Sequence, residues 1–266
     1  MSRPASREAP LNIVALEIGA GHVEQILTSN DPQSWRLRVA PSTHYADAQL
    51  DDYRGRVHRE FRWSPPVRLS LSARTSIARP AGTFGFGFWN DPFSIGLGIR
   101  GSARSLPRTP QTAWFFYASP PSDMCLHHEV PGDGWKTATL LSRPLHPALL
   151  LPGAVMAFLG MQVRPLRRGL HALMRRFYKA EEARLHFDPS QWHSYVVDWR
   201  EDRVVFLMDG EIQAVSTEPP RPPLGLVFWI DNQYAVVSPE KGMRFGVVPV
   251  DEPQWLEIAD VHVQSG

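Results

Sequence analysis

The sequence predicts an all-β protein, a two-sheet antiparallel jelly-roll sandwich with one helical insertion. Three observations lead to this fold class. Residues 192–216 have the pattern of a β-meander. The chain contains 25 prolines and 19 glycines, which favour many turns and few long helices. Its 266 residues are also a suitable length for one large sandwich domain.

The meander is the clearest element of the sequence. Trp192–Trp199 is rich in the aromatic and β-branched residues that suit a half-buried strand. Arg203–Met208 alternates with the period of two that a strand requires. Asp209-Gly210 follows, and this pair favours a type I′ hairpin turn, in which both central residues need a positive φ. Glu211–Ser216 is the predicted return strand.

The composition is that of an ordinary globular chain without a basic surplus. The 28 basic residues nearly balance the 27 acidic ones, so a net charge of +1 gives no case for nucleic-acid binding. Cys125 is the only cysteine, which excludes an intrachain disulfide. Met1–Gln25 lacks the apolar segment of a secretion signal, which predicts a cytoplasmic location. We predict a mobile tail at residues 1–10 and a single domain at residues 11–266.

Several strand patterns precede the meander. Leu11–Leu27 is predicted to form two short strands around a Gly-Ala-Gly turn, and Trp35–Val39 and Arg68–Arg74 alternate as half-buried strands do. Asp51 and Asp52 are interpreted as part of a solvated turn. These patterns place most of the N-terminal third in sheets.

Glycine alternates with phenylalanine within Pro80–Pro92. This alternation predicts a strand with one face filled by rings and the other pressed against a neighbouring backbone. After the meander, Leu224–Tyr234 is predicted to be a buried strand that ends in polar residues. Trp255–Val263 is the predicted closing strand.

Parts of this pattern resemble glycoside hydrolase family 16, within the concanavalin A-like lectin/glucanase superfamily. The segments that carry the resemblance are Trp192-His193-Ser194-Tyr195, Asp198-Trp199, the strand that ends in Asp209-Gly210, and Gly82–Trp89. The resemblance covers roughly residues 30–140 and 188–264. It implies a jelly roll with a ligand cleft on its concave face, in which Trp89 would lie.

The strand that carries the family's chemistry differs in this chain. Retaining glycosidases place two carboxyl groups on opposite sides of the scissile bond. The family supplies them from a Glu-x-Asp-x-x-Glu strand. The corresponding segment here, Gln111–Ser119, contains no carboxylate, and the pattern occurs nowhere else in the chain. The resemblance therefore implies the fold without the hydrolytic signature.

Our first functional hypothesis is a non-hydrolytic protein that binds a glycan or another small ligand on the concave face. Aromatic rings would stack on the ligand and polar side chains would hydrogen-bond to it, although core filling explains each ring equally well. The candidate binding residues are Trp89, Asn90, Asp91, Trp114, Tyr117, Trp229, Asp231, Asn232 and Tyr234.

The alternative hypothesis is a glycoside hydrolase whose acids come from other positions and converge only in the fold. The candidate acids are Asp91, Asp123, Glu129 and Asp231. Two carboxyl groups about 5–5.5 Å apart would indicate a retaining mechanism, and about 6.5–9.5 Å an inverting one.

His127-His128-Glu129 combines residue types that bind zinc. Adjacent histidines on an extended chain point to opposite faces, however, and no third histidine follows at a suitable spacing. The sequence therefore predicts no metal site and no cofactor. Cys125 is interpreted as a small buried residue.

Residues 141–187 interrupt the β pattern. Ala148–Val163 is strongly apolar but shorter than a membrane span, and Arg164–Leu185 is predicted to be an amphipathic helix. One interpretation is a helical insertion packed on the sandwich, with solvated arginines. The other is a peripheral membrane or partner-docking element, whose basic face meets anionic lipid. The arginines of that face are Arg167, Arg168, Arg175 and Arg176.

Overall fold

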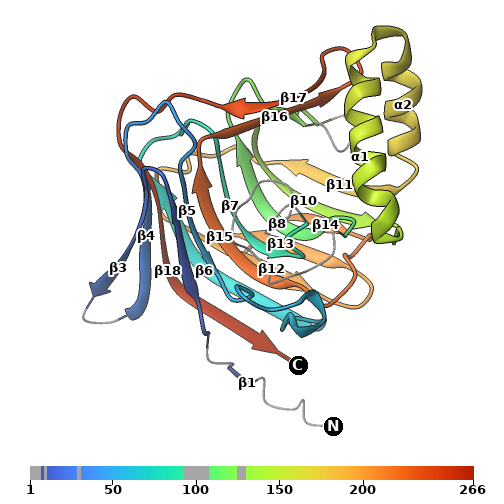
Figure 1. Ribbon diagram of the computed structural model, residues 1–266. Helices are drawn as coiled ribbons and strands as arrows, with labels where there is room; N and C mark the ends of the chain where they lie inside the picture. The colour runs from blue at the N-terminus through green and yellow to red at the C-terminus, as the bar shows by residue number, and fades with distance from the viewer. Residues whose placement is uncertain (1–6, 9–10, 29–30, 93–107, 125–129) are drawn as a thin grey trace.

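The computed structural model describes residues 7–8, 11–28, 31–92, 108–124 and 130–266. Two large sheets form the body of the protein, a three-stranded sheet lies along one end, and a helical hairpin stands at one corner (Figure 1). The predictions for Cys125, for the His127-His128-Glu129 segment and for Glu129 as a candidate acid concern residues outside the described ranges.

The first sheet contains eight strands, all in antiparallel pairs. Seven of them lie in the order β14 (Glu211–Ser216), β13 (Val204–Met208), β12 (His193–Trp199), β6 (Val67–Thr75), β18 (Gln254–Ser265), β4 (Asp31–Val39) and β3 (Gly21–Thr28). The eighth strand, β1 (Arg7–Glu8), pairs with β18. Within the predicted tail, Arg7 and Glu8 lie opposite Ser265 and Gln264 at the end of β18.

The second sheet contains seven strands, also in antiparallel pairs. Their order is β11 (Tyr178–Arg184), β10 (Gly134–Ser142), β8 (Gln111–Ala118), β7 (Thr83–Trp89), β15 (Gly225–Asp231), β5 (Asp47–Asp51) and β2 (Val14–Ile18). These two sheets confirm the predicted antiparallel jelly-roll sandwich.

A third, smaller sheet contains β17 (Gly242–Val247), β16 (Gln233–Ser238) and β9 (Asp123–Met124). The β16–β17 pair is antiparallel, whereas β9 pairs with β16 in parallel. In Figure 1 this sheet crosses one end of the sandwich and reaches the helices.

The hydrophobic core lies between the two large sheets. Alternate residues of β6 are buried, and Phe84, Phe86 and Phe88 of β7 are at most 1% exposed. Phe86 contacts Tyr195 of the opposite sheet edge to face, with the ring centroids 5.0 Å apart. The inward side of the Gly-Phe strand is thus filled by rings, as predicted.

The predicted meander is confirmed as β12, β13 and β14. Asp209 and Gly210 have φ angles of 51° and 81°, the positive values that the type I′ turn requires. The Asp209 carboxylate also accepts a hydrogen bond of 2.9 Å from the Ser194 backbone N–H. The turn residue therefore fixes the register as well as the reversal.

The prediction of a solvated turn at Asp51 and Asp52 is wrong, because both side chains are buried. Asp51 ends β5 and forms an ion pair with Arg54. Asp52 accepts hydrogen bonds from Trp63 Nε1 at 2.5 Å and from the Leu226 backbone N–H at 2.7 Å. Leu226 is far from Asp52 in the sequence, so no local pattern indicates that contact, and these partners give each carboxylate a structural role.

The insertion between β10 and β11 contains α1 (Pro147–Gln162), a 3₁₀ turn at Arg164–Leu166 and α2 (Arg167–Met174). The predicted helix over Arg164–Leu185 is wrong beyond Met174, because residues 178–184 form strand β11 and pair with β10. Sheet pairing overrides the helix preference of this segment, whose lysine, alanine, glutamate and arginine residues are all good helix formers. Among the described residues, no single helix is long and apolar enough to span a membrane, although α1 and Arg164–Met174 qualify together as a pair bent by 114°.

Candidate functional site

Three tryptophans gather on the outer face of the seven-stranded sheet, the face opposite the core. We call Trp89, Trp114 and Trp229 the indole cluster. The ring centroids lie 5.8 Å apart for Trp89 and Trp114, 5.1 Å for Trp114 and Trp229, and 6.5 Å for Trp89 and Trp229. The last pair is nearly parallel, at 9°. The cluster therefore unites three predicted site residues from β7, β8 and β15.

Glycines on β7 provide the floor of the cluster. Gly85 pairs with Trp229 on one side and with Phe116 on the other, and a Cβ at Gly85 would lie 2.7 Å from Trp229 Cη2. A Cβ at Gly87 would lie 2.7 Å from Trp114 Cβ. The Gly-Phe alternation thus fills the core with phenylalanine and leaves room for indoles on the opposite face.

Hydrogen bonds hold the indoles of Trp89 and Trp229 in place. Trp89 Nε1 donates to Tyr53 Oη at 2.7 Å, and Gln49 Nε2 donates to the same hydroxyl at 3.2 Å. Trp229 Nε1 donates to Thr83 Oγ1 at 2.9 Å. Trp114 Nε1, by contrast, is buried with no hydrogen-bond partner among the described residues. The Trp114 side chain as a whole is half-buried, so part of its ring remains accessible to solvent.

A buried carboxyl pair lies at one end of this face. Asp47 of β5 and Asp231 of β15 are directly opposite each other in the antiparallel register, and both are less than a tenth exposed. Burial raises the pKa of Asp231 to about 6. Burial also raises the pKa of Asp47, and the Asp231 charge adds to the increase. Asp47 Oδ1 has no hydrogen-bond partner among the described residues.

This arrangement gives the two carboxyl groups different surroundings. Asp231 Oδ1 accepts hydrogen bonds from Thr83 Oγ1 at 2.8 Å and from the Gln233 backbone N–H at 3.0 Å. Asp47 instead accepts a hydrogen bond from the Tyr45 hydroxyl. Because burial raises the pKa of both carboxyl groups, the pair takes up a proton at higher pH than exposed carboxyl groups do, and the protonated pair can donate a hydrogen bond or act as an acid.

Lys136 of β10 and Glu182 of the neighbouring edge strand, β11, form a buried ion pair. Lys136 Nζ lies 2.8 Å from Glu182 Oε1, and the side chains are 2% and 0% exposed. Lys136 is opposite Phe116, and its ammonium lies 5.8 Å from the centre of that ring. The outer face thus runs from a carboxyl pair, across the indoles, to a buried ion pair.

Three of the predicted binding residues have structural roles. Tyr117 lies in the core and stacks on Phe84 with the centroids 4.7 Å apart, so its placement on the binding face is wrong. Asn90 accepts from the Gln111 backbone N–H and donates to the Thr109 carbonyl, both at 2.9 Å. Asn232 is completely buried. Its amide oxygen accepts from the Ala46 N–H, and its amide nitrogen donates to the His44 and Val248 carbonyls. Both N–H groups and the oxygen of the side chain therefore have partners.

The candidate acids do not converge. Asp91 follows Trp89 at one end of the β7–β15 pair, whereas Asp231 lies at the other end, about 20 Å along the strands. Asp123 is in β9 and forms an ion pair of 2.8 Å with Lys241. Asp231 is instead adjacent to Asp47, which the sequence did not single out. Tyr234 lies in β16, where its ring packs over Gly246.

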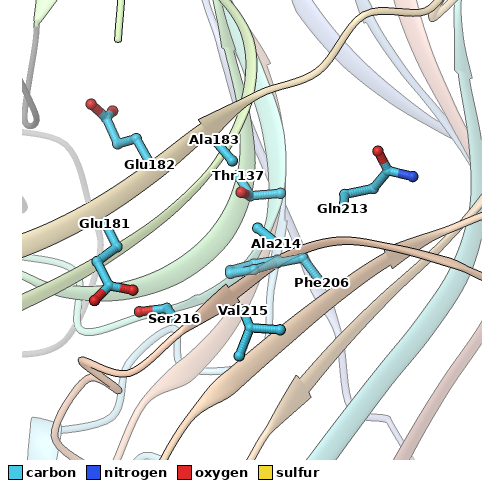
Figure 2. A pocket seen from close by; sticks show the side chains of 9 residues that line it. All are labelled: Thr137, Glu181, Glu182, Ala183, Phe206, Gln213, Ala214, Val215 and Ser216. Atoms are coloured by element: carbon cyan, nitrogen blue, oxygen red, sulfur yellow. The ribbon is translucent and has the colours of Figure 1, made fainter. Parts of the chain in front are cut away.

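A separate hollow of about 370 Å³ opens between the edge strands β11 and β14 (Figure 2). Figure 2 shows Glu181 next to Ser216, with Glu182 on the other side of β11. The Glu181 carboxylate accepts hydrogen bonds of 3.0 Å from both the backbone N–H and the hydroxyl of Thr217. The acid therefore joins the edges of the two sheets, and we assign no ligand to this hollow.

No family model matches the sequence, and no curated protein matches it. Solved structures of glycan-degrading enzymes and lectin-like domains resemble the chain at low identity. A legume lectin-like domain from Entamoeba histolytica is 8% identical, with 96% of this chain and 90% of that chain covered and a TM-score of 0.47. A laminarinase from Flavobacterium sp. UMI-01 is 10% identical, with coverages of 90% and 82% and a TM-score of 0.45.

The Bacillus licheniformis beta-glucanase is 11% identical over 100% of both chains, with a TM-score of 0.41. At such identities and TM-scores, the likeness assigns no activity to this chain.

Proposed function

We propose that this protein binds a carbohydrate on the outer face of the seven-stranded sheet, without hydrolysing it. The observation that carries the proposal is the indole cluster, in which three tryptophan rings lie within 6.5 Å of one another on one sheet face. Indole rings offer flat apolar surfaces that suit the C–H faces of sugars, and polar groups at their edges fix orientation.

The polar groups that the proposal needs surround the cluster. Gln49 and Thr83 are half-buried, so their side chains reach both the indoles and solvent. Within the described part of the chain, Trp114 Nε1 is an unpaired donor and Asp47 Oδ1 is an unpaired oxygen. A sugar hydroxyl can donate and accept, and therefore could satisfy either of these groups. Binding would remove the cost of leaving them buried and unpaired.

A second candidate function is glycoside hydrolysis by the Asp47–Asp231 pair. The raised pKa of Asp231 favours this candidate, since a general acid needs to keep its proton near neutral pH. The hydrogen bonds from Thr83 and Gln233 favour a structural role for the same carboxyl group. We therefore place hydrolysis second.

Titration with β-1,3-linked and mixed-linkage glucan oligosaccharides, followed by tryptophan fluorescence, tests the binding proposal. Trp114→Ala should weaken binding at least about fivefold, because a stacked ring contributes about 1 kcal/mol beyond its buried area. Trp192→Ala is the matched control, because Trp192 is 46% exposed and lies before β12, outside the indole cluster. Binding that survives Trp114→Ala but not Trp192→Ala would move the site elsewhere.

A reducing-end assay with the same glucans separates the two functions. We expect no release of reducing ends by the wild-type protein. Turnover that disappears in Asp47→Asn or Asp231→Asn, while the fluorescence response to sugar remains, would establish the hydrolase instead.

A further inference from the structure

We propose that the helical insertion docks on an anionic membrane surface, with α1 in the interface and the phosphate groups of lipids in a cationic pocket at its base. This inference concerns a surface separate from the indole cluster and does not depend on carbohydrate binding. Two independent features carry it, an exposed apolar helix and a pocket lined by arginines.

The first feature is the surface of α1. Its sequence, PALLLPGAVMAFLGMQ, has no charged residue, and Met161 is its only buried side chain. Leu151, Met156 and Leu159 are 66%, 68% and 55% exposed. Figure 1 shows α1 and α2 standing side by side at a corner of the molecule, beyond β17 and β11. Monomeric soluble proteins rarely expose an apolar surface of this extent without a partner.

Contacts at the end of α1 fix the hairpin to the body. Gln162 Nε2 donates to the Met243 carbonyl of β17 at 2.8 Å. Arg167 donates to the Met161 carbonyl at 2.8 Å and to the Glu240 carbonyl at 3.0 Å. Arg167 therefore holds the hairpin rather than facing lipid, which corrects one of the four arginines predicted for that face. The exposed surface is presented in a defined orientation.

The second feature is a pocket of about 520 Å³ where the insertion leaves the sheet. Its cationic lining residues are Arg143, Arg175, Arg176, Lys179 and Arg221. Lys179 forms an ion pair of 2.6 Å with Glu218. Among the described residues, the other four side chains have no ion pair, and no acidic residue lines the pocket.

Charge complementarity identifies the partner. Residues 143–180 contain no aspartate or glutamate, so the insertion carries only positive charge next to its apolar surface. Four clustered guanidinium groups repel one another until an anion binds, and the planar fork of arginine matches phosphate oxygens. An apolar helix beside a cationic pocket fits a lipid bilayer, in which the headgroup phosphates lie next to the apolar interior.

The experiment is flotation of the full-length protein with vesicles of phosphatidylcholine alone, and of phosphatidylcholine mixed with phosphatidylglycerol. We expect binding to the mixed vesicles that weakens as salt screens the arginines. Arg175→Gln/Arg176→Gln should weaken it roughly thirtyfold, since each basic residue near an anionic surface contributes roughly fivefold. Arg200→Gln/Arg203→Gln, in the turn between β12 and β13, is the charge-matched control and should bind as the wild type does.

A second pair of variants tests the apolar surface without altering charge. Leu151→Gln/Met156→Gln should weaken vesicle binding at least tenfold, because burying even one large apolar side chain contributes that much. Ile212→Gln/Val215→Gln changes two exposed apolar residues of β14, 63% and 47% exposed, and should have no effect. Circular dichroism confirms that each variant is folded.

Three results would overturn the proposal. The first is that wild-type protein does not float with either type of vesicle. The second is a concentration-dependent dimer in lipid-free solution that Leu151→Gln/Met156→Gln abolishes, which would assign the apolar surface to a second copy of the chain. The third is binding of soluble glycerol phosphate without vesicle binding, which would make the pocket a site for a soluble phosphate compound.

Discussion

Asp231→Asn should make the folded protein more stable at neutral pH, although it removes a buried and hydrogen-bonded side chain. Asparagine keeps an oxygen that can accept from Thr83 and Gln233, as Asp231 Oδ1 does. It also removes the negative charge opposite Asp47 and supplies an amide donor near the unpaired Asp47 Oδ1. The substitution therefore preserves the local hydrogen bonds while relieving the repulsion within the pair.

The pKa of Asp231 determines the size and sign of the effect. A carboxyl group with a raised folded-state pKa contributes its full stability below the unfolded value, near 3.8, and loses it as pH rises through the folded value of about 6. Two pKa units correspond to about 3 kcal/mol. Because Asp47 shares the site, we expect Asp231→Asn to gain about 1 to 3 kcal/mol at neutral pH and almost nothing near pH 4.

Urea unfolding followed by tryptophan fluorescence, at several values from about pH 4 to about pH 8, measures this difference. Other titrating groups occur in both proteins and cancel in the comparison. Asp202→Asn is the control, because Asp202 is 62% exposed and its surface ion pair with Arg203 contributes little to stability. A stability difference between Asp231→Asn and wild type that does not change with pH, or a large loss at neutral pH, would refute the account of the carboxyl pair.

Three further substitutions test other parts of the structure. Lys136→Met should destabilise the protein by about 3–5 kcal/mol in urea unfolding, because it leaves the buried Glu182 charge without its counter-ion. Adding Glu182→Leu should restore most of the lost stability. Asp209→Pro should abolish cooperative thermal unfolding, because its φ of 51° is inaccessible to proline. Gly85→Ala should displace the Trp229 ring, which reduces the near-ultraviolet circular dichroism of the indoles and the fluorescence response to sugar; unchanged spectra would contradict the close packing.

The sequence predicted the sandwich well, because its main signals are local. Alternation in β6, the Gly-Phe pattern of β7 and the Asp209-Gly210 turn each depend on neighbours in the chain. The helix predicted over residues 164–185 failed beyond Met174, because β11 is determined by pairing with β10 and by the buried contact between Glu182 and Lys136. The small sheet of β9, β16 and β17 also joins distant segments, and no local pattern indicates it.

The candidate site was predicted only in part, for the same reason. The resemblance and the predicted concave-face strands identified Trp89, Trp114 and Trp229. The period of two could have excluded Tyr117, since it lies three residues after Trp114 and must face the other way, whereas Phe116 shares the face of Trp114. No local signal identifies Asp47 as the partner of Asp231, because the strand register that brings them together connects residues far apart in the chain.

The position of the insertion makes it separable from the rest of the molecule. Ser142 and Tyr178 are direct partners at the last pair of the β10–β11 ladder, so the whole helical hairpin replaces what would otherwise be a short reverse turn. Because closing a longer loop adds little entropic cost, a sandwich can acquire or lose such a segment without changing its strand register. A chain with a two-residue turn in its place would keep the indole cluster and the carboxyl pair. The ligand-binding face and the docking element could then evolve, or be engineered, independently.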